Sequence, residues 1–308
     1  MRKFIILADI TCDLSAEIRE AFGITDYLPG HVHISDGRDF PTRLDWSEIA
    51  REDFYDALSN RKLEVTSAPP SPEEYYEKFR KYAEEDTDII SISISSKFSS
   101  TYNVACGAAN RIREEFPGCD IRCIDSYRMS GAMGLLVVYA HILQKEGRSM
   151  DEICAWLEEN KKCVHQMGPI DDLIFVARRG RLTMGKAIMG SFAGVKPMGD
   201  CNADGYVSVL ARAKGIGRAL DVTVRYLEKM ASDVSDQYLI ISHSNRYAYA
   251  EKLRDLITEK MNPKKVFISD VFSGCGTNIG PGMVAVYFMG EPISEDMVKE
   301  KEAMNELL

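Results

Sequence analysis

The stretch that decides the fold class reads Ile89-Ile90-Ser91-Ile92-Ser93-Ile94-Ser95-Ser96. Residues 89–94 have the apolar, β-branched character of a buried strand. The strand runs into a serine doublet, and the pattern over about Ser100–Phe116 predicts a helix. A buried strand that is followed directly by a helix is typical of the units that build a parallel α/β sheet.

The same alternation extends over the first half of the chain. A complete helix start stands at Ser71, where serine caps, Pro72 takes the first helical position and Glu74 completes a capping box. We therefore expect a mostly parallel sheet with flanking helices. The predicted strands are Phe4–Ala8, Tyr27–Ile34, Ile89–Ile94 and Ile121–Ile124, and the predicted helices are Ser15–Phe22, Trp46–Asn60, Ser71 to about Glu84 and Gly131–Glu146.

The second half of the chain reads as a smaller, mixed α/β unit. A helix at Met150–Lys161 precedes a glycine-rich, basic region over residues 178–196. We expect two domains, residues 1–160 and residues 161–308. The elements predicted after the basic region are strands Tyr206–Arg212, Tyr238–Ser242, Val266–Val271 and Met283–Met289 and helices Arg218–Met230 and Tyr247–Met261.

Composition limits the classes of function. The formal net charge is −9, which argues against nucleic-acid binding because phosphate contacts need a basic surface. No window has the length of a membrane span, and the apolar run after Met1 is too short for a signal peptide. We therefore expect a cytoplasmic protein whose eight cysteines are reduced thiols. The five histidines are scattered, so no metal site is expected.

Hydroxyl residues follow several predicted strands of the first half: Thr66 and Ser67, Ser95 and Ser96, and Ser130 before Gly131. In an open parallel sheet, ligands bind beyond the carboxyl ends of the strands, where helix starts offer free N–H groups. Each hydroxyl could instead merely cap the next helix. The recurrence of doublets favours a site that holds a carboxylate without reacting with it.

Other chemistries find little support in the sequence. The turn after Phe4–Ala8 is no Gly-x-Gly-x-x-Gly turn, and the chain contains neither a Walker loop nor a Gly-x-Ser-x-Gly elbow. His243 could serve as a base for Ser96 or Thr66, but an ordinary loop role is the simpler interpretation. A hydrolase or an acyl or phosphoryl transferase with a hydroxyl nucleophile therefore stands as the alternative function.

Two further segments leave their roles open. The glycine cluster Gly274–Gly282 either brings backbone close to a ligand or forms a tight loop between strands. The apolar residues Met184, Ile188, Met189, Phe192, Val195 and Met198 either line an adaptable channel or pack in an ordinary core.

These residues together resemble the DegV family over most of the chain. Their order and spacing, rather than any one motif, carry the resemblance. The matching segments are Ala8-Asp9-Ile10-Thr11-Cys12-Asp13-Leu14, Thr66-Ser67-Ala68-Pro69-Pro70-Ser71-Pro72, Ser95-Ser96-Lys97-Phe98-Ser99-Ser100-Thr101-Tyr102, Asp125-Ser126 with Ser130-Gly131 and Gly134, Arg179-Gly180-Arg181 with Lys196-Pro197, and Gly280-Pro281-Gly282.

The resemblance implies a two-domain fold of the DegV type, also called the EDD fold, with a long-chain fatty acid bound between the domains and no further cofactor. It implies that Thr66 and Ser96 hold the carboxylate. It also implies that the chain is no enzyme but a lipid-binding carrier that presents the acid to a separate fatty acid kinase. The remaining residues expected at the carboxylate are Ser67, Ser95, Ser130, Gly131 and Asn278, and those expected to face the kinase or the phosphate are Arg181 and Arg212.

Three residues depart from the family pattern. Ile10 replaces a serine, Ser100 replaces a glycine, and Asn278 stands where the family often carries a histidine. Asparagine can donate a hydrogen bond to a carboxylate but cannot carry charge or shuttle a proton. A third reading of the chain is a regulatory protein in which the lipid is structural. It predicts that emptying the pocket unfolds the protein without changing the activity of any partner.

Overall fold

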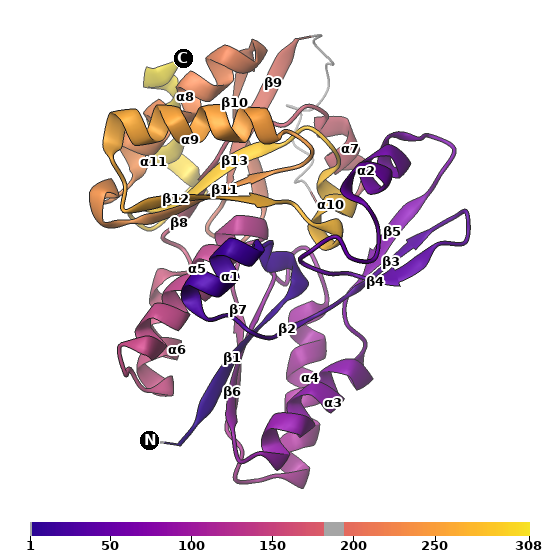
Figure 1. The fold of residues 1–308 in the computed structure, drawn as a ribbon. Coiled ribbons are helices and arrows are strands. Elements are labelled where there is room, and N and C mark those ends of the chain that lie inside the picture. Colours follow the sequence, from indigo (N-terminus) through magenta and orange to yellow (C-terminus); the bar gives the residue numbers. More distant parts are fainter. Residues whose placement is uncertain (1, 182–193) are drawn as a thin grey trace.

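The computed structural model of the chain describes residues 2–181 and 194–308 (Figure 1). Its first sheet is parallel throughout, as predicted, and three of its strands lead into helices. The strand order is β2-β1-β6-β7. These strands are β1 (Phe4–Asp9), β2 (Tyr27–Leu28), β6 (Asp88–Ser93) and β7 (Ile121–Asp125). The predicted strand Tyr27–Ile34 is divided: Tyr27–Leu28 joins this sheet, whereas His31–Ile34 pairs in a separate antiparallel sheet.

Helices cover both faces of this sheet. Leu7, Ile89 and Ile121 pack against α3 and α4 on one face, whereas Ile6 and Ile90 share a core with α5 on the other. Helix α3 begins as predicted, with both arms of the Ser71–Glu74 capping box formed. The helices are α1 (Ala16–Phe22), α3 (Pro72–Glu84), α4 (Thr101–Glu115), α5 (Ser130–Lys145) and α6 (Met150–Asn160), and a short 3-10 helix covers Ile10–Cys12.

The second half forms a mixed sheet in the order β12-β11-β13-β8. Strands β11 and β12 are parallel, while β13 runs antiparallel to both β11 and β8. Helix α5 lies between the two sheets and contacts both (Figure 1). The strands are β8 (Val164–Met167), β11 (Tyr238–His243), β12 (Lys265–Asp270) and β13 (Val284–Met289), and the helices beside them are α8 (Gly215–Met230), α9 (Tyr247–Met261) and α11 (Val298–Leu307).

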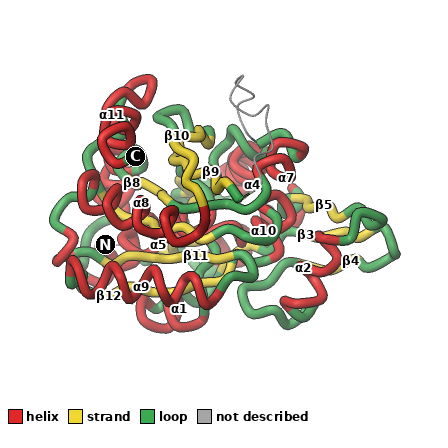
Figure 2. Tube along the Cα trace, turned by 90° about the horizontal axis from the view of Figure 1, so that it is seen from above, coloured by secondary structure: helices red, strands yellow, loops and turns green. Residues whose placement is uncertain are grey.

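A hairpin and a small lobe complete the fold. The antiparallel hairpin joins β9 (Val195–Cys201) to β10 (Val207–Lys214). The small lobe has its own apolar core, to which Val32, Phe54 and Val65 contribute, and it lies to one side of the molecule (Figure 2). Its elements are β3 (His31–Ile34), β4 (Asp39–Pro41), β5 (Val65–Ala68) and α2 (Arg51–Ser59).

Some elements differ from the sequence prediction. The helix predicted from Trp46 begins only at Arg51, because Trp46 has a positive φ of 56° and directs its ring into the aromatic cluster around Phe54. Of the two interpretations of the glycine cluster, a tight loop does not describe its start, where α10 (Ser273–Ile279) forms. The elements that were not predicted are β4, β8, β9, α7 (Leu173–Arg178), α10, α11 and the short 3-10 helices Ile10–Cys12, Val234–Asp236 and Glu295–Met297.

Asp13 joins the first half of the chain to the second. One of its carboxylate oxygens accepts from the Ser130 hydroxyl at 2.6 Å, and the other accepts from the backbone N–H of Phe272 at 2.9 Å. Its carbonyl oxygen accepts from the Ser269 hydroxyl at 2.6 Å. The side chain is fully buried, and this burial raises the pKa of Asp13 to about 8.

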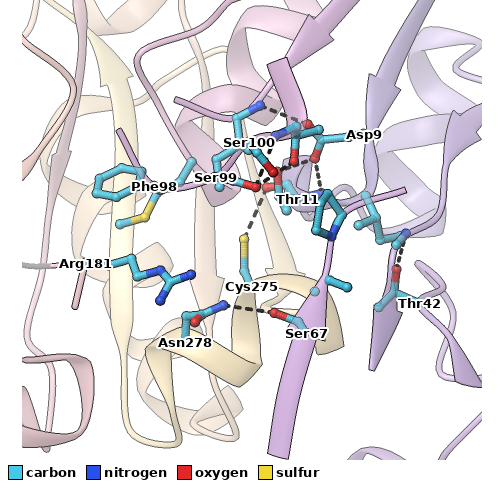
Figure 3. A pocket seen from close by; sticks show the side chains of 18 of the residues that line it. Asp9, Thr11, Thr42, Ser67, Phe98, Ser99, Ser100, Arg181, Cys275 and Asn278 are labelled. Atoms are coloured by element: carbon cyan, nitrogen blue, oxygen red, sulfur yellow. Dashed lines mark hydrogen bonds between the residues drawn. The ribbon is translucent and has the colours of Figure 1, made fainter. Parts of the chain in front are cut away.

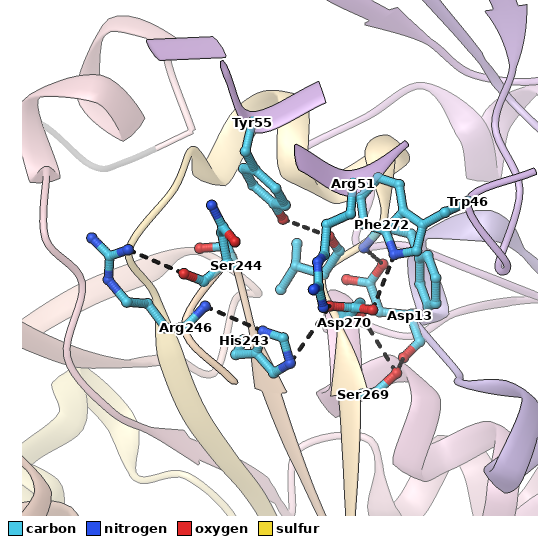
Figure 4. A network of polar contacts seen from close by, with 12 residues as sticks. Asp13, Trp46, Arg51, Tyr55, His243, Ser244, Arg246, Ser269, Asp270 and Phe272 are labelled. Carbon is cyan, nitrogen blue, oxygen red and sulfur yellow. Dashed lines mark hydrogen bonds and ion pairs between the residues drawn. The ribbon is translucent and has the colours of Figure 1, made fainter. Parts of the chain in front are cut away.

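A second group of polar contacts holds the small lobe against β12 (Figure 4). The Trp46 indole N–H donates to the Asp270 carboxylate at 3.0 Å, and the Arg51 guanidinium lies 3.3 Å from the other oxygen of that carboxylate. The Tyr55 hydroxyl donates to the carbonyl oxygen of Val271 at 2.6 Å. The lobe is therefore fixed to the second half by directional bonds as well as by its aromatic side chains.

Candidate functional site

A cavity of about 400 Å³ lies where the two sheets and the small lobe meet. Its walls come from the carboxyl ends of β1 and β6, from the segment after β5, and from α10. This is the edge of the parallel sheet at which ligands are expected to bind. The wall segments are residues 9–11, 67–70, 94, 96–101, 274–275 and 278–279, with single residues from other elements.

Hydroxyl groups gather at the first turn of α4, on one wall of the cavity (Figure 3). The Ser99 and Thr101 hydroxyls are 2.7 Å apart, and the Ser99 hydroxyl also accepts from the backbone N–H of Thr101. Ser96 lies just before them, and its backbone N–H donates to Asp125. A helix start with free N–H groups and hydroxyl donors suits an anion such as a carboxylate.

Ser67 and Asn278 face each other across the cavity mouth. The Asn278 side-chain amide donates to the Ser67 hydroxyl at 3.1 Å, although 211 positions separate the two residues in the chain. Arg181 also lines the cavity, and Figure 3 shows its guanidinium beside Asn278. The mouth therefore combines a hydroxyl, a neutral amide and a cation, and all three can donate hydrogen bonds to a carboxylate.

Asp9 lies in the floor of the same cavity and is almost completely buried. Its carboxyl accepts from the backbone N–H groups of Thr11 at 2.8 Å and Ile94 at 2.9 Å, and from the Thr11 hydroxyl. Burial raises the pKa of Asp9, and these hydrogen bonds oppose that effect only in part. A raised pKa lessens the repulsion that a bound carboxylate would otherwise meet at this wall.

Four of the predicted site residues line the cavity: Ser67, Ser96, Asn278 and Arg181. Thr66 does not, because side chains alternate along β5 and its side chain is exposed while Ser67 faces inward.

The other predicted site residues lie outside the lining. The Ser95 hydroxyl is buried and donates to the carbonyl oxygen of Gly205 at 3.0 Å. Ser130 is engaged with Asp13, and Gly131 packs so closely on Tyr287 that a Cβ would lie 2.4 Å from the ring. Arg212 is exposed on β10.

The tip of the β9–β10 hairpin packs against the serine doublet beside the cavity. Gly205 has a φ of 87°, and a Cβ at this position would lie 2.6 Å from the Ser95 hydroxyl. Tyr206 packs edge-on against Phe98, and the Lys97 ammonium lies 5.8 Å from the centre of the Tyr206 ring. The tip can approach the serine doublet this closely only because a glycine stands there.

A second, apolar cavity of about 70 Å³ continues inward from the first. The two share Met129, Val176, Val207 and Ile279, so they form one site with a polar mouth and an apolar interior. Met198, which was predicted for such a channel, lines the inner part. The other predicted channel residues Met184, Ile188, Met189 and Phe192 lie outside the described residues, and Val195 begins β9.

Several lining residues were not predicted. Asp9, Thr11, Lys97, Phe98 and Cys275 all line the cavity. For the first four, position was the available signal, since each follows or ends a strand of the parallel sheet. Cys275 had none, because the helix that places it was not predicted; its thiol donates to the carbonyl oxygen of Thr11 at 3.4 Å.

Two sheets with flanking helices enclose a cavity that has a polar mouth and an apolar interior. This arrangement is typical of two-lobed α/β proteins that bind a ligand. The chain belongs to the DegV family, a family of uncharacterised proteins whose model matches residues 3–291. A DegV domain-containing protein of Clostridium perfringens is 32% identical over 291 residues, which cover 94% of this chain and 99% of the relative.

Solved structures share the fold over nearly the whole chain. A DegV family protein from Thermus thermophilus, described for its fatty acid binding, superposes with a TM-score of 0.83 at 24% identity and covers 94% of this chain and 100% of its own. The fatty acid kinase B3 protein of Streptococcus pneumoniae, loaded with linoleic acid, gives a TM-score of 0.79 at 19% identity with the same coverage. At these identities the likeness establishes the fold.

Within residues 2–181 and 194–308, no helix combines the length and the apolar character that a bilayer crossing requires.

Proposed function

We propose that this protein binds a long-chain fatty acid in the cavity between its lobes and presents it to a separate kinase that forms an acyl phosphate. One observation carries the binding proposal: a mouth rich in hydrogen-bond donors opens into an apolar interior. That pairing matches a ligand with one charged end and one hydrocarbon end. The fatty acids held by structural neighbours of the same fold support it.

The carboxylate end would lie against Ser67, Ser96 and the first turn of α4, with Arg181 and Asn278 beside it. Hydrogen bonds to a charged group each contribute about 1.5–3 kcal/mol. The tail would extend past Met129 and Ile279 into the inner cavity, where each buried methylene contributes about 0.8 kcal/mol. The gross gain for a long tail is on the order of 10 kcal/mol, and the costs of binding reduce the net value.

We further propose that the protein acts as a carrier without catalysis of its own. Of the two hydroxyls that the alternative would use as a nucleophile, only Ser96 lines the cavity, and the described lining includes no histidine to accept its proton. Stoichiometric labelling of the chain by a serine-reactive probe would favour the hydrolase or transferase alternative instead.

The binding test is direct. Purified protein is extracted with organic solvent, the extract is identified by mass spectrometry, and the emptied protein is titrated with labelled stearate. A near one-to-one fatty acid is expected in wild type. The variant Ser67→Ala/Ser96→Ala should lose at least tenfold in affinity, because it removes two donors to the carboxylate.

Thr66→Ala is the matched control, since it removes a neighbouring hydroxyl that faces solvent on the other side of β5. Its affinity should equal that of wild type. An empty protein that also fails to take up stearate would overturn the proposal.

The presentation step has its own test. Arg181 lines the mouth and Arg212 is exposed on the hairpin beside it. The charge reversal Arg212→Glu should abolish phosphorylation of the bound acid by a purified fatty acid kinase while stearate stays bound, whereas Arg181→Glu should weaken both, because Arg181 also lies beside the carboxylate. Unchanged phosphorylation in Arg212→Glu would exclude Arg212 from the encounter with the kinase.

A further inference from the structure

The inner cavity contains one polar group that a plain hydrocarbon tail cannot satisfy. Gln166 belongs to its wall, and this residue is only 8% exposed. Its amide oxygen, Oε1, is buried and has no hydrogen-bond partner among the described residues. A buried amide carbonyl that lacks a donor loses the hydrogen bond it would make with water, so such groups are rare in folded proteins.

Strand geometry turns the Gln166 side chain toward the cavity. Gln166 pairs with Tyr287 of β13, whose ring lines the same cavity, and paired residues lie on the same face of a sheet. Its neighbour in the chain, His165, points to the opposite face, where its ring nitrogen bonds Asp200 at 2.8 Å. The alternation of side chains along β8 therefore directs Gln166 inward.

The Tyr287 hydroxyl belongs to the same wall but does not bond Oε1, and the other described residues of this wall offer Gln166 no side-chain donor. The cavity wall near it consists mainly of apolar and thioether side chains, among them Ile170, Met198 and Met283. Thioether sulfur is only a weak acceptor, and aliphatic groups donate nothing. A saturated or unsaturated hydrocarbon tail would leave Oε1 without a hydrogen-bond donor.

We propose that the preferred ligand is a hydroxy fatty acid, a long-chain acid whose tail carries a hydroxyl that donates to Oε1 of Gln166. The inference rests on the proposed function, because it places this hydroxyl on the tail of the fatty acid bound in the cavity. The free group is an acceptor, so the ligand must supply a donor. A hydroxyl qualifies, whereas a ketone or an epoxide does not.

Emptied wild-type protein is titrated calorimetrically with stearate, with hydroxystearates bearing the hydroxyl near the carboxyl end, at mid-chain or near the methyl end, and with the matching oxostearates. One hydroxystearate is expected to bind about tenfold more tightly than stearate, and its oxo counterpart is not. Equal affinity for stearate and all hydroxystearates would overturn the inference and point to a buried water at Oε1. Tighter binding of an oxostearate would also overturn it.

Gln166→Leu should remove the preference while stearate still binds. Gln144→Leu is the control, because the Gln144 amide donates to the carbonyl oxygen of Phe4 outside the cavity, and it should keep the preference. If Gln166→Leu does not fold, the wild-type comparison with oxostearates decides alone. A protein that binds no acid of the series refutes the proposed function, whereas equal binding of stearate and hydroxystearates refutes only the present inference.

Discussion

Asp13→Asn should change how the stability of the protein depends on pH. The carboxyl is buried at the joint between the two halves, and its pKa lies at about 8 in the folded state, against an ordinary value of 3.8. Between these two values the folded chain keeps a proton that the unfolded chain releases. The folded state therefore binds more protons, and the free energy of unfolding falls as pH rises through this window.

The size of the effect follows from the two pKa values. Between pH 5 and pH 7, this single group should lower the free energy of unfolding by roughly 2–3 kcal/mol. The substituted amide keeps the geometry, since its oxygen can accept from the N–H of Phe272 and its NH₂ can donate to the Ser130 hydroxyl. The amide does not titrate, so the fall in the free energy of unfolding with pH that Asp13 causes should be absent from the variant.

Urea unfolding of wild type and Asp13→Asn at several pH values from 5 to 7, followed by circular dichroism, measures the two slopes. Some slope should remain in the variant, because burial also raises the pKa of Asp9. Asp56→Asn, an exposed aspartate on α2, controls for the loss of one negative charge and should match wild type. Equal slopes in wild type and Asp13→Asn would refute the reasoning.

Three further predictions concern the site and its support. Asn278→Asp places a negative charge at the mouth and should weaken stearate binding at least tenfold at neutral pH, as measured by calorimetry; unchanged affinity would remove Asn278 from the carboxylate site. Gly276→Val should destabilise the fold by about 1–3 kcal/mol in urea unfolding, since a Cβ there lies 2.8 Å from the Phe54 ring; wild-type stability would show that the ring can yield. Trp46→Phe should cost about 1–2 kcal/mol by leaving Asp270 without its indole donor, and a neutral result would mean that Arg51 suffices.

The first sheet was predictable because its signals are local. Each apolar run forms a strand without help from distant residues, and the capping box at Ser71 starts α3 through groups only three positions apart. The carboxyl ends of the strands then locate the cavity by topology alone. Ser96 could therefore be assigned to the site from its place after a strand.

The sequence could not show which residues line the cavity where one position decides the face of a strand. Thr66 and Ser67 are chemically similar and adjacent, yet the alternation along β5 exposes the first and turns the second inward. The register follows from pairing with β3, which no local pattern in the segment reveals. Ser130 likewise lies outside the lining and bonds Asp13, a contact that the sequence does not reveal because 117 positions separate the two residues.

Helix α10 shows a different limit. Gly274 and Gly276 have low helix propensity, so the segment reads as a loop. The close approach of Phe54 to Gly276 and of Ile10 to Gly274 leaves no room for larger side chains at either position. Tertiary packing overrides local preference here, and this packing also positions Asn278 and Cys275 at the cavity.

The strand order of the second sheet determines when the protein can first hold a ligand. β13, the last strand in the chain, lies between β11 and β8, and the wall helix α10 directly precedes it. During synthesis the first sheet can fold while these segments are still inside the ribosome. The cavity therefore cannot form before α10 and β13 have been synthesised, and until then β8 and β11 each keep an unpaired edge.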